Sequence, residues 1–127
     1  MKASLCTLVV LVTLTGCTGN KPDSYERGLV FESGGQTHQI TRSCTSSVTL
    51  DHDDASNPVV LVSMVDSPEC NGAVQEFTED HVGGKMSTRF DDQYLVRDAD
   101  VYSPIRGSFR FRVENDNQGK AVVDYYR

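Results

Sequence analysis

The amino-acid sequence predicts an α+β domain over residues 28–127, with a mostly antiparallel sheet and one main helix. Most apolar residues fall in short runs that are bounded by Gly, Pro, Asn and Asp, and several of these runs alternate as strands do. Helical spacing, with apolar residues three and four positions apart, is found in one segment. Strands that cluster around a helix, instead of alternating with helices, favour antiparallel pairing.

The first half of this domain is expected to consist of strands. A short apolar run at residues 29–31 comes first, and residues 37–41 and 47–50 alternate in part. Residues 59–65 make the strongest strand, because they are β-branched, continuous and preceded by Pro58. The polar residues between the last two strands, 51–58, read as a turn.

The helix is expected to begin near residue 71. Asn71 is suited to cap the helix N-terminus, and Val74, Phe77 and His81 recur at spacings of three and four. Gly83, followed by a second glycine, ends the helix, where a residue in the left-handed conformation is favoured.

Strands are expected again after the helix. Residues 86–90, 94–102 and 107–114 alternate, and in the last of these Phe, Phe and Val face one way while Arg, Arg and Glu face the other. Residues 115–119, Asn-Asp-Asn-Gln-Gly, read as a turn that returns the chain into a final strand at residues 121–126.

The N-terminus resembles a bacterial lipoprotein signal peptide. Met1-Lys2 is followed by an apolar run too short to span a bilayer, and this run ends in Leu14-Thr15-Gly16-Cys17, which resembles a lipobox. The resemblance implies cleavage before Cys17 and acylation of that residue, so that buried acyl chains hold the protein to a membrane. We therefore expect a signal peptide at residues 1–16, a lipidated tether at 17–27 and the folded domain at 28–127.

This resemblance also predicts the location. Removing residues 1–16 takes away Lys2 and none of the 18 acidic residues, so the net charge falls from −6 to −7. An acidic chain is poorly suited to bind nucleic acid, which is held mainly by Lys and Arg. Thr18 follows the cysteine where inner-membrane retention usually needs Asp, which favours the outer membrane, with the domain facing the periplasm.

Two cysteines remain for the domain, Cys44 and Cys70. An even pair in an oxidising compartment predicts a disulfide, and closing its loop of about 25 residues is worth about 3 kcal/mol. The alternative is a redox pair or a pair of metal ligands, although no Cys-x-x-Cys motif is present.

Residues 77–95 resemble a recurrent stretch of SecD, a membrane subunit of the bacterial protein-export machinery. In the head of its first periplasmic domain a helix ending in Phe and Thr leads through a turn to a strand, an Asp-containing hairpin and a Ser/Ala-Pro-x-Ile segment. The last of these looks like Ser103-Pro104-Ile105 here, and order and spacing match over residues 73–113. The resemblance implies a ferredoxin-like, SecD-head-type α+β fold. SecD also has multi-pass membrane helices and a larger base that we do not see here, so its activity is not carried over.

The candidate metal ligands do not form a known motif. His38, His52 and His81 lie far apart in the sequence, and no His-Glu-x-x-His pattern is present. We expect His81 to cap the helix C-terminus and His38 to face solvent. One loop carries oxygen ligands that calcium could use, but it lacks the glycine and closing glutamate of an EF-hand, so a solvated turn is favoured; its residues are Asp51, Asp53, Asp54 and Asn57.

Three arginines make the remaining candidate site, a partner-binding face formed by Arg106, Arg110 and Arg112. Tyr125 or Tyr126 is expected to lie across from this face, which could bind an acidic protein or a glycan. The alternative is a solvated sheet face that limits edge-to-edge aggregation.

These patterns predict a non-enzymatic binding or scaffold lipoprotein of the cell envelope, without metal or cofactor, that contacts another envelope protein. The alternatives are an accessory factor of protein export or envelope assembly and a surface inhibitor or exclusion protein. A hydrolase is the weakest alternative, because no Gly-x-Ser-x-Gly motif is present.

Overall fold

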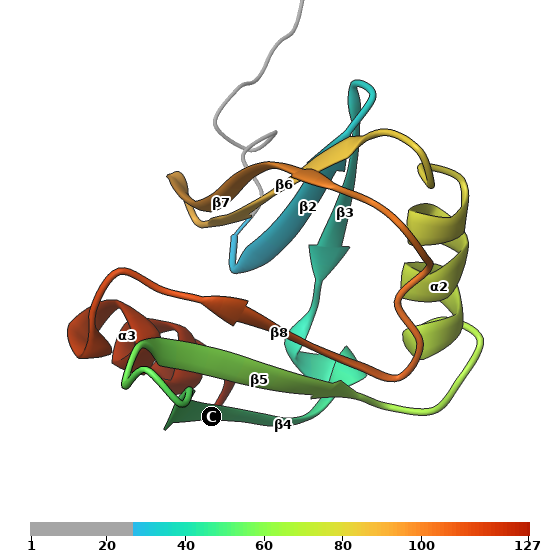
Figure 1. Ribbon diagram of the computed structural model, residues 1–127. Helices are drawn as coiled ribbons and strands as arrows, with labels where there is room; N and C mark the ends of the chain where they lie inside the picture. The colour runs from blue at the N-terminus through green and yellow to red at the C-terminus, as the bar shows by residue number, and fades with distance from the viewer. Residues whose placement is uncertain (1–26) are drawn as a thin grey trace, which may run out of the picture.

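The computed structural model describes residues 27–127, which fold into two antiparallel sheets and two α-helices (Figure 1). The predicted signal peptide and nearly all of the tether, with Cys17, lie outside the described residues. The elements follow in the order β2 (Leu29–Ser33), β3 (Gln36–Ile40), the 3₁₀ helix η3 (Arg42–Cys44), β4 (Thr45–His52), β5 (Pro58–Met64), α2 (Asn71–Glu79), β6 (Lys85–Phe90), β7 (Gln93–Asp100), β8 (Ser108–Arg112) and α3 (Asp116–Tyr126).

The predicted α+β class and antiparallel pairing are confirmed, but the strands divide between two sheets. One sheet has the strand order β3-β2-β6-β7 and the other has the order β4-β5-β8. In Figure 1 the two sheets lie one above the other, with α2 along one side and α3 against the three-stranded sheet at the opposite end.

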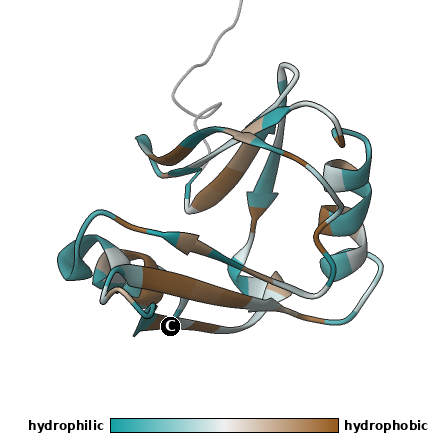
Figure 2. Cartoon of the chain, viewed as in Figure 1, coloured by the Kyte–Doolittle hydropathy of each residue, from teal (hydrophilic) through white to brown (hydrophobic). Residues whose placement is uncertain are grey.

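The core lies between the inner faces of the two sheets. Phe31 of β2 meets Phe109 of β8 edge to face, with 5.1 Å between ring centroids, and both Val60 and Val62 of β5 are fully buried. Figure 2 shows the most hydrophobic segments on β2 and β5, the central strands of this packing. The predicted alternation of β8 is therefore confirmed, because its phenylalanines face the core.

Helix α2 closes one side of the core. Val74 and Thr78 are fully buried on its inner face. The Thr78 hydroxyl donates to the carbonyl of Val74 at 2.9 Å and accepts the amide of Ile105 at 2.8 Å, which fixes the segment that leads to β8. Burying a hydroxyl is tolerated here because both its donor and its acceptor roles are filled.

The start of α2 differs from the prediction. Asn71 is the first residue of the helix and not its cap, and the preceding residue, Cys70, makes no side-chain capping bond. The Asn71 side chain accepts the amide of Ser67 at 2.9 Å and donates to Asp66 at 3.1 Å. It thus organises the turn before the helix.

The largest error of the sequence prediction is at the C-terminus, where residues 116–126 form helix α3 and no strand. Asn115 is the helix N-cap, and its side chain accepts the amide of Gln118 at 2.9 Å. The Gln118 side chain in turn accepts the amide of Glu114 at 2.7 Å, an arrangement close to a capping box. Asn and Asp favour both turns and helix starts, so the residues interpreted as a hairpin turn begin a helix.

Tertiary packing completes this helix. Gly119, Val122 and Tyr126 are its buried residues, and they share one face by helical spacing. A Cβ at Gly119 would lie 2.5 Å from Leu50, so the missing side chain lets α3 pack closely on β4. The Tyr126 hydroxyl accepts the amide of Leu29 at 2.7 Å and donates to the carbonyl of Ile40 at 2.6 Å. The last helix is therefore hydrogen-bonded to both β2 and β3.

Candidate binding groove between the two sheets

The predicted disulfide is present. Cys44, at the end of η3, is bonded to Cys70, immediately before α2, with a Cα–Cα distance of 5.0 Å. The backbone carbonyl of Cys44 also accepts the amide of Val65 at 2.8 Å, which continues the pairing of β4 with β5. The bond therefore has a structural position at one end of the three-stranded sheet.

The three histidines take part in separate local contacts. His81 contacts the carbonyl of Phe77 through Nδ1 at 2.7 Å, so it satisfies a carbonyl near the end of α2. His38 is half-buried, with its ring centroid 5.7 Å from that of Phe77, so the prediction that it faces solvent is wrong. His52 pairs with Asp116 of α3 at 2.9 Å. Within residues 27–127 no three His, Cys, Asp or Glu side chains are grouped to hold a metal ion.

The acidic loop between β4 and β5 is organised by Asp53. Its carboxylate accepts the amides of Asn57 at 2.9 Å and Ala55 at 3.0 Å, and it receives Arg112 at 3.2 Å. The hydrogen bond from the Asn57 backbone, above all, lowers the pKa of Asp53 below its ordinary value. These contacts are those of a structured turn, with the carboxylate engaged by donors of the protein itself.

Two of the three predicted arginines share one face of the three-stranded sheet. Arg110 and Arg112 lie on the outer side of β8, because their neighbours Phe109 and Phe111 point into the core. Arg106 precedes the strand and is separated from it by Gly107, which has a positive φ of 82°.

The expectation that Tyr125 or Tyr126 lies across from the arginines is wrong. Tyr126 is a core residue, and the guanidinium of Arg42 stacks on Tyr125 at 4.0 Å from the ring centroid. Both tyrosines belong to α3, which packs on the inner side of the three-stranded sheet through Gly119 and Leu50.

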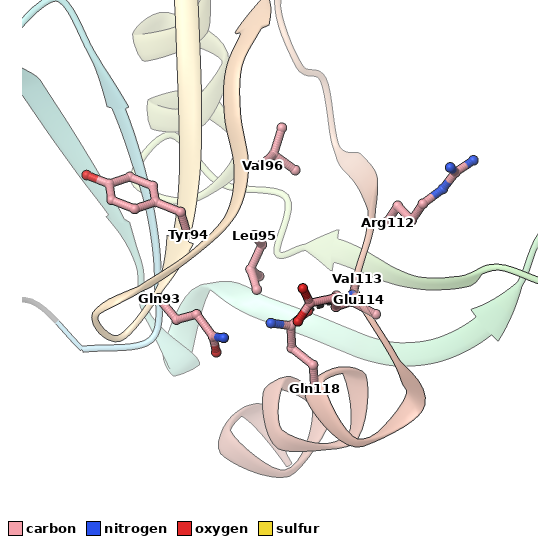
Figure 3. Close-up of a pocket in the computed structure, with 8 residues that line it drawn as sticks. All are labelled: Gln93, Tyr94, Leu95, Val96, Arg112, Val113, Glu114 and Gln118. Atoms are coloured by element: carbon pink, nitrogen blue, oxygen red, sulfur yellow. Dashed lines mark hydrogen bonds between the residues drawn. The ribbon is translucent and has the colours of Figure 1, made fainter.

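A groove that the sequence prediction missed lies where the edge strands of the two sheets approach each other. It is a cavity of about 330 Å³, and we call it the inter-sheet groove. Figure 3 draws its lining residues, which come from β7, from the end of β8 and from the start of α3: Gln93, Tyr94, Leu95, Val96, Arg112, Val113, Glu114 and Gln118.

The groove combines an apolar floor with a polar mouth. In Figure 3 Leu95 points from β7 toward Glu114 and Gln118, while Gln93 and Gln118 approach from opposite sides. Val113 is buried beneath them. Since amide side chains both donate and accept hydrogen bonds, this mouth is suited to polar groups such as those of a peptide backbone.

The tyrosine of the groove is engaged elsewhere. The Tyr94 side chain points away from the cavity in Figure 3, and its hydroxyl donates to Glu32 at 2.6 Å. This hydrogen bond to Glu32 is the main cause that raises the pKa of Tyr94. The ionisable residues among the eight that line the groove are Tyr94, Arg112 and Glu114.

The sequence contained two signals for this groove. Asp91-Asp92 marked the hairpin that places Gln93, and Asn115 with Gln118 has the spacing of a helix N-terminus. The second signal was interpreted as a turn. The approach of β7 to β8 has no local signature, because it depends on the packing of the two sheets.

Comparisons with known proteins show the class of fold. No protein-family model and no curated protein matches the sequence. Among solved structures, the crystal structure of SecDF in its super-membrane-facing form matches with a TM-score of 0.55 and 12% identity. A second SecDF structure, described as a membrane component that enhances protein export, matches with a TM-score of 0.51 and 12% identity.

The fold of residues 27–127 is thus a SecD-like domain fold, as the resemblance predicted. The matches cover 68% and 69% of this chain, and this chain spans 12% and 38% of the two SecDF chains. At this identity the likeness shows a shared fold and not a shared activity. Within the described residues, neither helix has the length and apolar character needed to cross a bilayer.

Proposed function

We propose that this protein is a non-enzymatic binding module of the bacterial cell envelope, anchored through a lipid on Cys17 and directed at another envelope protein. The inter-sheet groove is the observation that carries the proposal. Its floor is apolar and its mouth is lined by amides and a carboxylate, while the hydroxyl of Tyr94 already donates a hydrogen bond to Glu32. A shallow groove of this kind suits a segment of a protein partner.

The chemistry of the groove indicates the form of that segment. Gln93 and Gln118 can bind backbone groups of an extended chain, while Leu95 provides an apolar contact between them. Gln118 is already held by the amide of Glu114 at 2.7 Å, so part of the mouth is preorganised. Preorganised groups lose less conformational freedom on binding.

The more specific proposal is an accessory role in protein export or envelope assembly. The SecD-like domain fold supports it, because SecDF is described as enhancing protein export. In this proposal the domain contacts components of the export machinery from the periplasmic side of the membrane.

Photocrosslinking in intact cells tests the binding role. A photoreactive amino acid at Gln93 samples the groove, and a matched probe at Gln36 samples an exposed position at the start of β3. We expect one dominant envelope protein to be captured from position 93 and not from position 36. Equal capture from both positions, or no capture from position 93, contradicts the proposal. Export components among the captures support the more specific role.

The lipid anchor has its own test. Labelled palmitate should be incorporated into the full chain and should be lost from Cys17→Ser, which should also move from the membrane fraction to the soluble fraction. Incorporation that survives Cys17→Ser contradicts the anchor. This result is independent of the groove, so the two parts of the proposal can fail separately.

A further inference from the structure

Within residues 27–127, strand β4 has an unpaired edge, and the hydrogen bonds of β5 show which β4 residues direct their backbone groups toward it. The amide of Met64 donates to the carbonyl of Gly107 at 2.8 Å, and the amide of Val113 donates to the carbonyl of Pro58 at 3.1 Å. The even-numbered residues at the two ends of β5, Pro58 and Met64, thus direct their backbone amide or carbonyl groups toward β8. Because the direction of the backbone amide and carbonyl alternates along a strand, the odd-numbered Leu61 directs its amide and carbonyl toward β4.

Thr49 lies directly opposite Leu61 and therefore turns its amide and carbonyl toward β5. Its neighbours Val48 and Leu50 turn theirs in the opposite direction. Strand β4 ends the order β4-β5-β8, so no described strand lies on that side. The backbone groups of Val48 and Leu50 form what we call the β4 edge.

The β4 edge carries few of the features that usually block edge-to-edge pairing. The strand from Thr45 to His52 contains no proline and no lysine, and its one irregularity lies between Thr45 and Ser47, ahead of the exposed groups. Edge strands are usually protected by such residues, by bulges or by a covering segment.

A cavity of about 500 Å³ lies along this edge. It is lined by residues 46–50 of β4 and, from the C-terminal end of α3, by Val123, Tyr126 and Arg127. An added strand would therefore find backbone partners on β4 and an apolar contact at Val123.

We propose that β4 pairs antiparallel with β4 of a second copy of this chain, about a two-fold axis at Thr49. In this register Val48 of each copy lies opposite Leu50 of the other, and their free amides and carbonyls hydrogen-bond to each other. The two three-stranded sheets then join into one continuous sheet. A two-fold contact of this kind is closed and self-complementary.

The side chains favour a second copy as the occupant. Residues 45–50 carry no charge, so the centre of the contact brings no like charges together. Asp51 lies opposite Ser47 of the other copy, and His52 lies opposite Ser46. On the inner side Val48 and Leu50, both half-buried in one copy, meet each other across the axis.

The geometry also agrees with a common membrane anchor. The two-fold axis runs perpendicular to the joined sheet, so each feature on its inner side stays on that side in both copies. Gly28, where the chain enters the domain, packs against Tyr125 and Tyr126 of α3 on the inner side. Both chains therefore enter from one side, while Arg110 faces the other. Agreement with a common membrane depends on the proposed lipid anchor, whereas the β4–β4 pairing does not.

A cysteine at the axis tests the contact in cells. Thr49 of one copy lies in a non-hydrogen-bonded pair with Thr49 of the other, where Cα atoms are about 4.5 Å apart, within the range of a disulfide. We expect full-length Thr49→Cys to form a dimer that is removed by reductant, several-fold above wild type. Ser108→Cys, at a position on the far strand β8 that is also exposed, is the matched control. No dimer from Thr49→Cys, or equal dimer from both variants, overturns the proposal.

A charge at the axis provides the second test. Thr49→Lys places two lysines opposite each other in the dimer, whereas in one copy the new side chain is exposed to solvent. Two differently tagged copies of the full-length chain should co-purify when both are wild type or when both carry Ser108→Lys. The amount that co-purifies should fall several-fold when both copies carry Thr49→Lys. Co-purification that is unchanged in Thr49→Lys contradicts the contact. An intact Cys44–Cys70 bond in each variant verifies that the domain is folded.

Discussion

The two sheets differ in what stabilises them away from the core. On the outer face of the four-stranded sheet, Glu32 of β2 forms an ion pair with Arg89 of β6 and accepts the hydroxyl of Tyr94. Arg89 also donates to the carbonyl of Asp91 at 2.6 Å. Val30, whose side chain shares this face, has no exposed surface. This face is covered by its own side chains.

The outer face of the three-stranded sheet has fewer internal contacts. Arg112 pairs with Asp53, whereas Arg110 makes no ion pair within the part of the chain that the structure describes. A covalent bond, Cys44–Cys70, lies at the end of this sheet instead. The comparison indicates that the first sheet is stabilised by its surface network, while the second is stabilised by a disulfide and keeps its face and β4 edge available for contacts.

Removing the disulfide should have the largest effect. Cys70→Ala should lower the free energy of unfolding by about 3 kcal/mol, because the unfolded chain regains the freedom of the loop between the cysteines. Urea unfolding monitored by circular dichroism measures it. Reductant should destabilise wild type by a similar amount and leave Cys70→Ala unchanged. A variant as stable as wild type would show that the three-stranded sheet does not depend on the bond.

Breaking the surface network of the other sheet should have the next largest effect. Arg89→Ala should cost about 2 kcal/mol, since it leaves the partly buried Glu32 without its main partner. Arg110→Ala, on the outer face of the three-stranded sheet, should change stability by less than about 0.5 kcal/mol. Urea unfolding of both variants compares the faces directly, and equal losses would remove the distinction between them.

The hydroxyl of Tyr126 connects the two sheets, because α3 packs on one sheet and this group bonds to strands of the other. Tyr126→Phe should cost about 1.5 kcal/mol, since the amide of Leu29 and the carbonyl of Ile40 lose a buried partner. Thermal and urea unfolding measure the loss. Tyr125→Phe is the matched control, and it should be close to wild type because Arg42 contacts the Tyr125 ring and not its hydroxyl.

A pH dependence should give the smallest effect. The hydrogen bond from Arg89, above all, lowers the pKa of Glu32 below its ordinary value of 4.5. A lowered pKa in the folded state stabilises the protein above the unfolded pKa, and this stabilisation is lost as the pH falls through the folded value. At pH 7 the free energy of unfolding of wild type should therefore exceed that of Glu32→Gln by less than about 1 kcal/mol.

That difference should shrink toward zero as the pH is lowered below the pKa of Glu32 in the folded protein. Urea unfolding at a series of pH values measures this difference. Arg110→Ala, which leaves Glu32 unchanged, is the control. A difference that is constant with pH would show that the carboxylate charge does not contribute.

The sequence by itself determined the elements whose signals are local. Strand β5, helix α2 and the core face of β8 were predicted from spacing, and the Cys44–Cys70 bond from the parity of cysteines in an oxidising compartment. The start of α3 had a local signal too, but Asn115 and Asp116 are as common in turns as in helix caps. The choice between them was made by the contact of Gly119 with Leu50, a residue far away in the chain.

Only the tertiary structure decided how the strands divide into two sheets, and with that the inter-sheet groove and the β4 edge. A strand's alternation shows which side chains share a face, but it does not show which strand becomes its neighbour. Gln93 and Gln118 line one groove because the two sheets pack face to face, and Val48 has no partner strand for its backbone among the described residues because β4 ends its sheet. Both facts depend on contacts between residues distant in sequence, where local patterns contain no information.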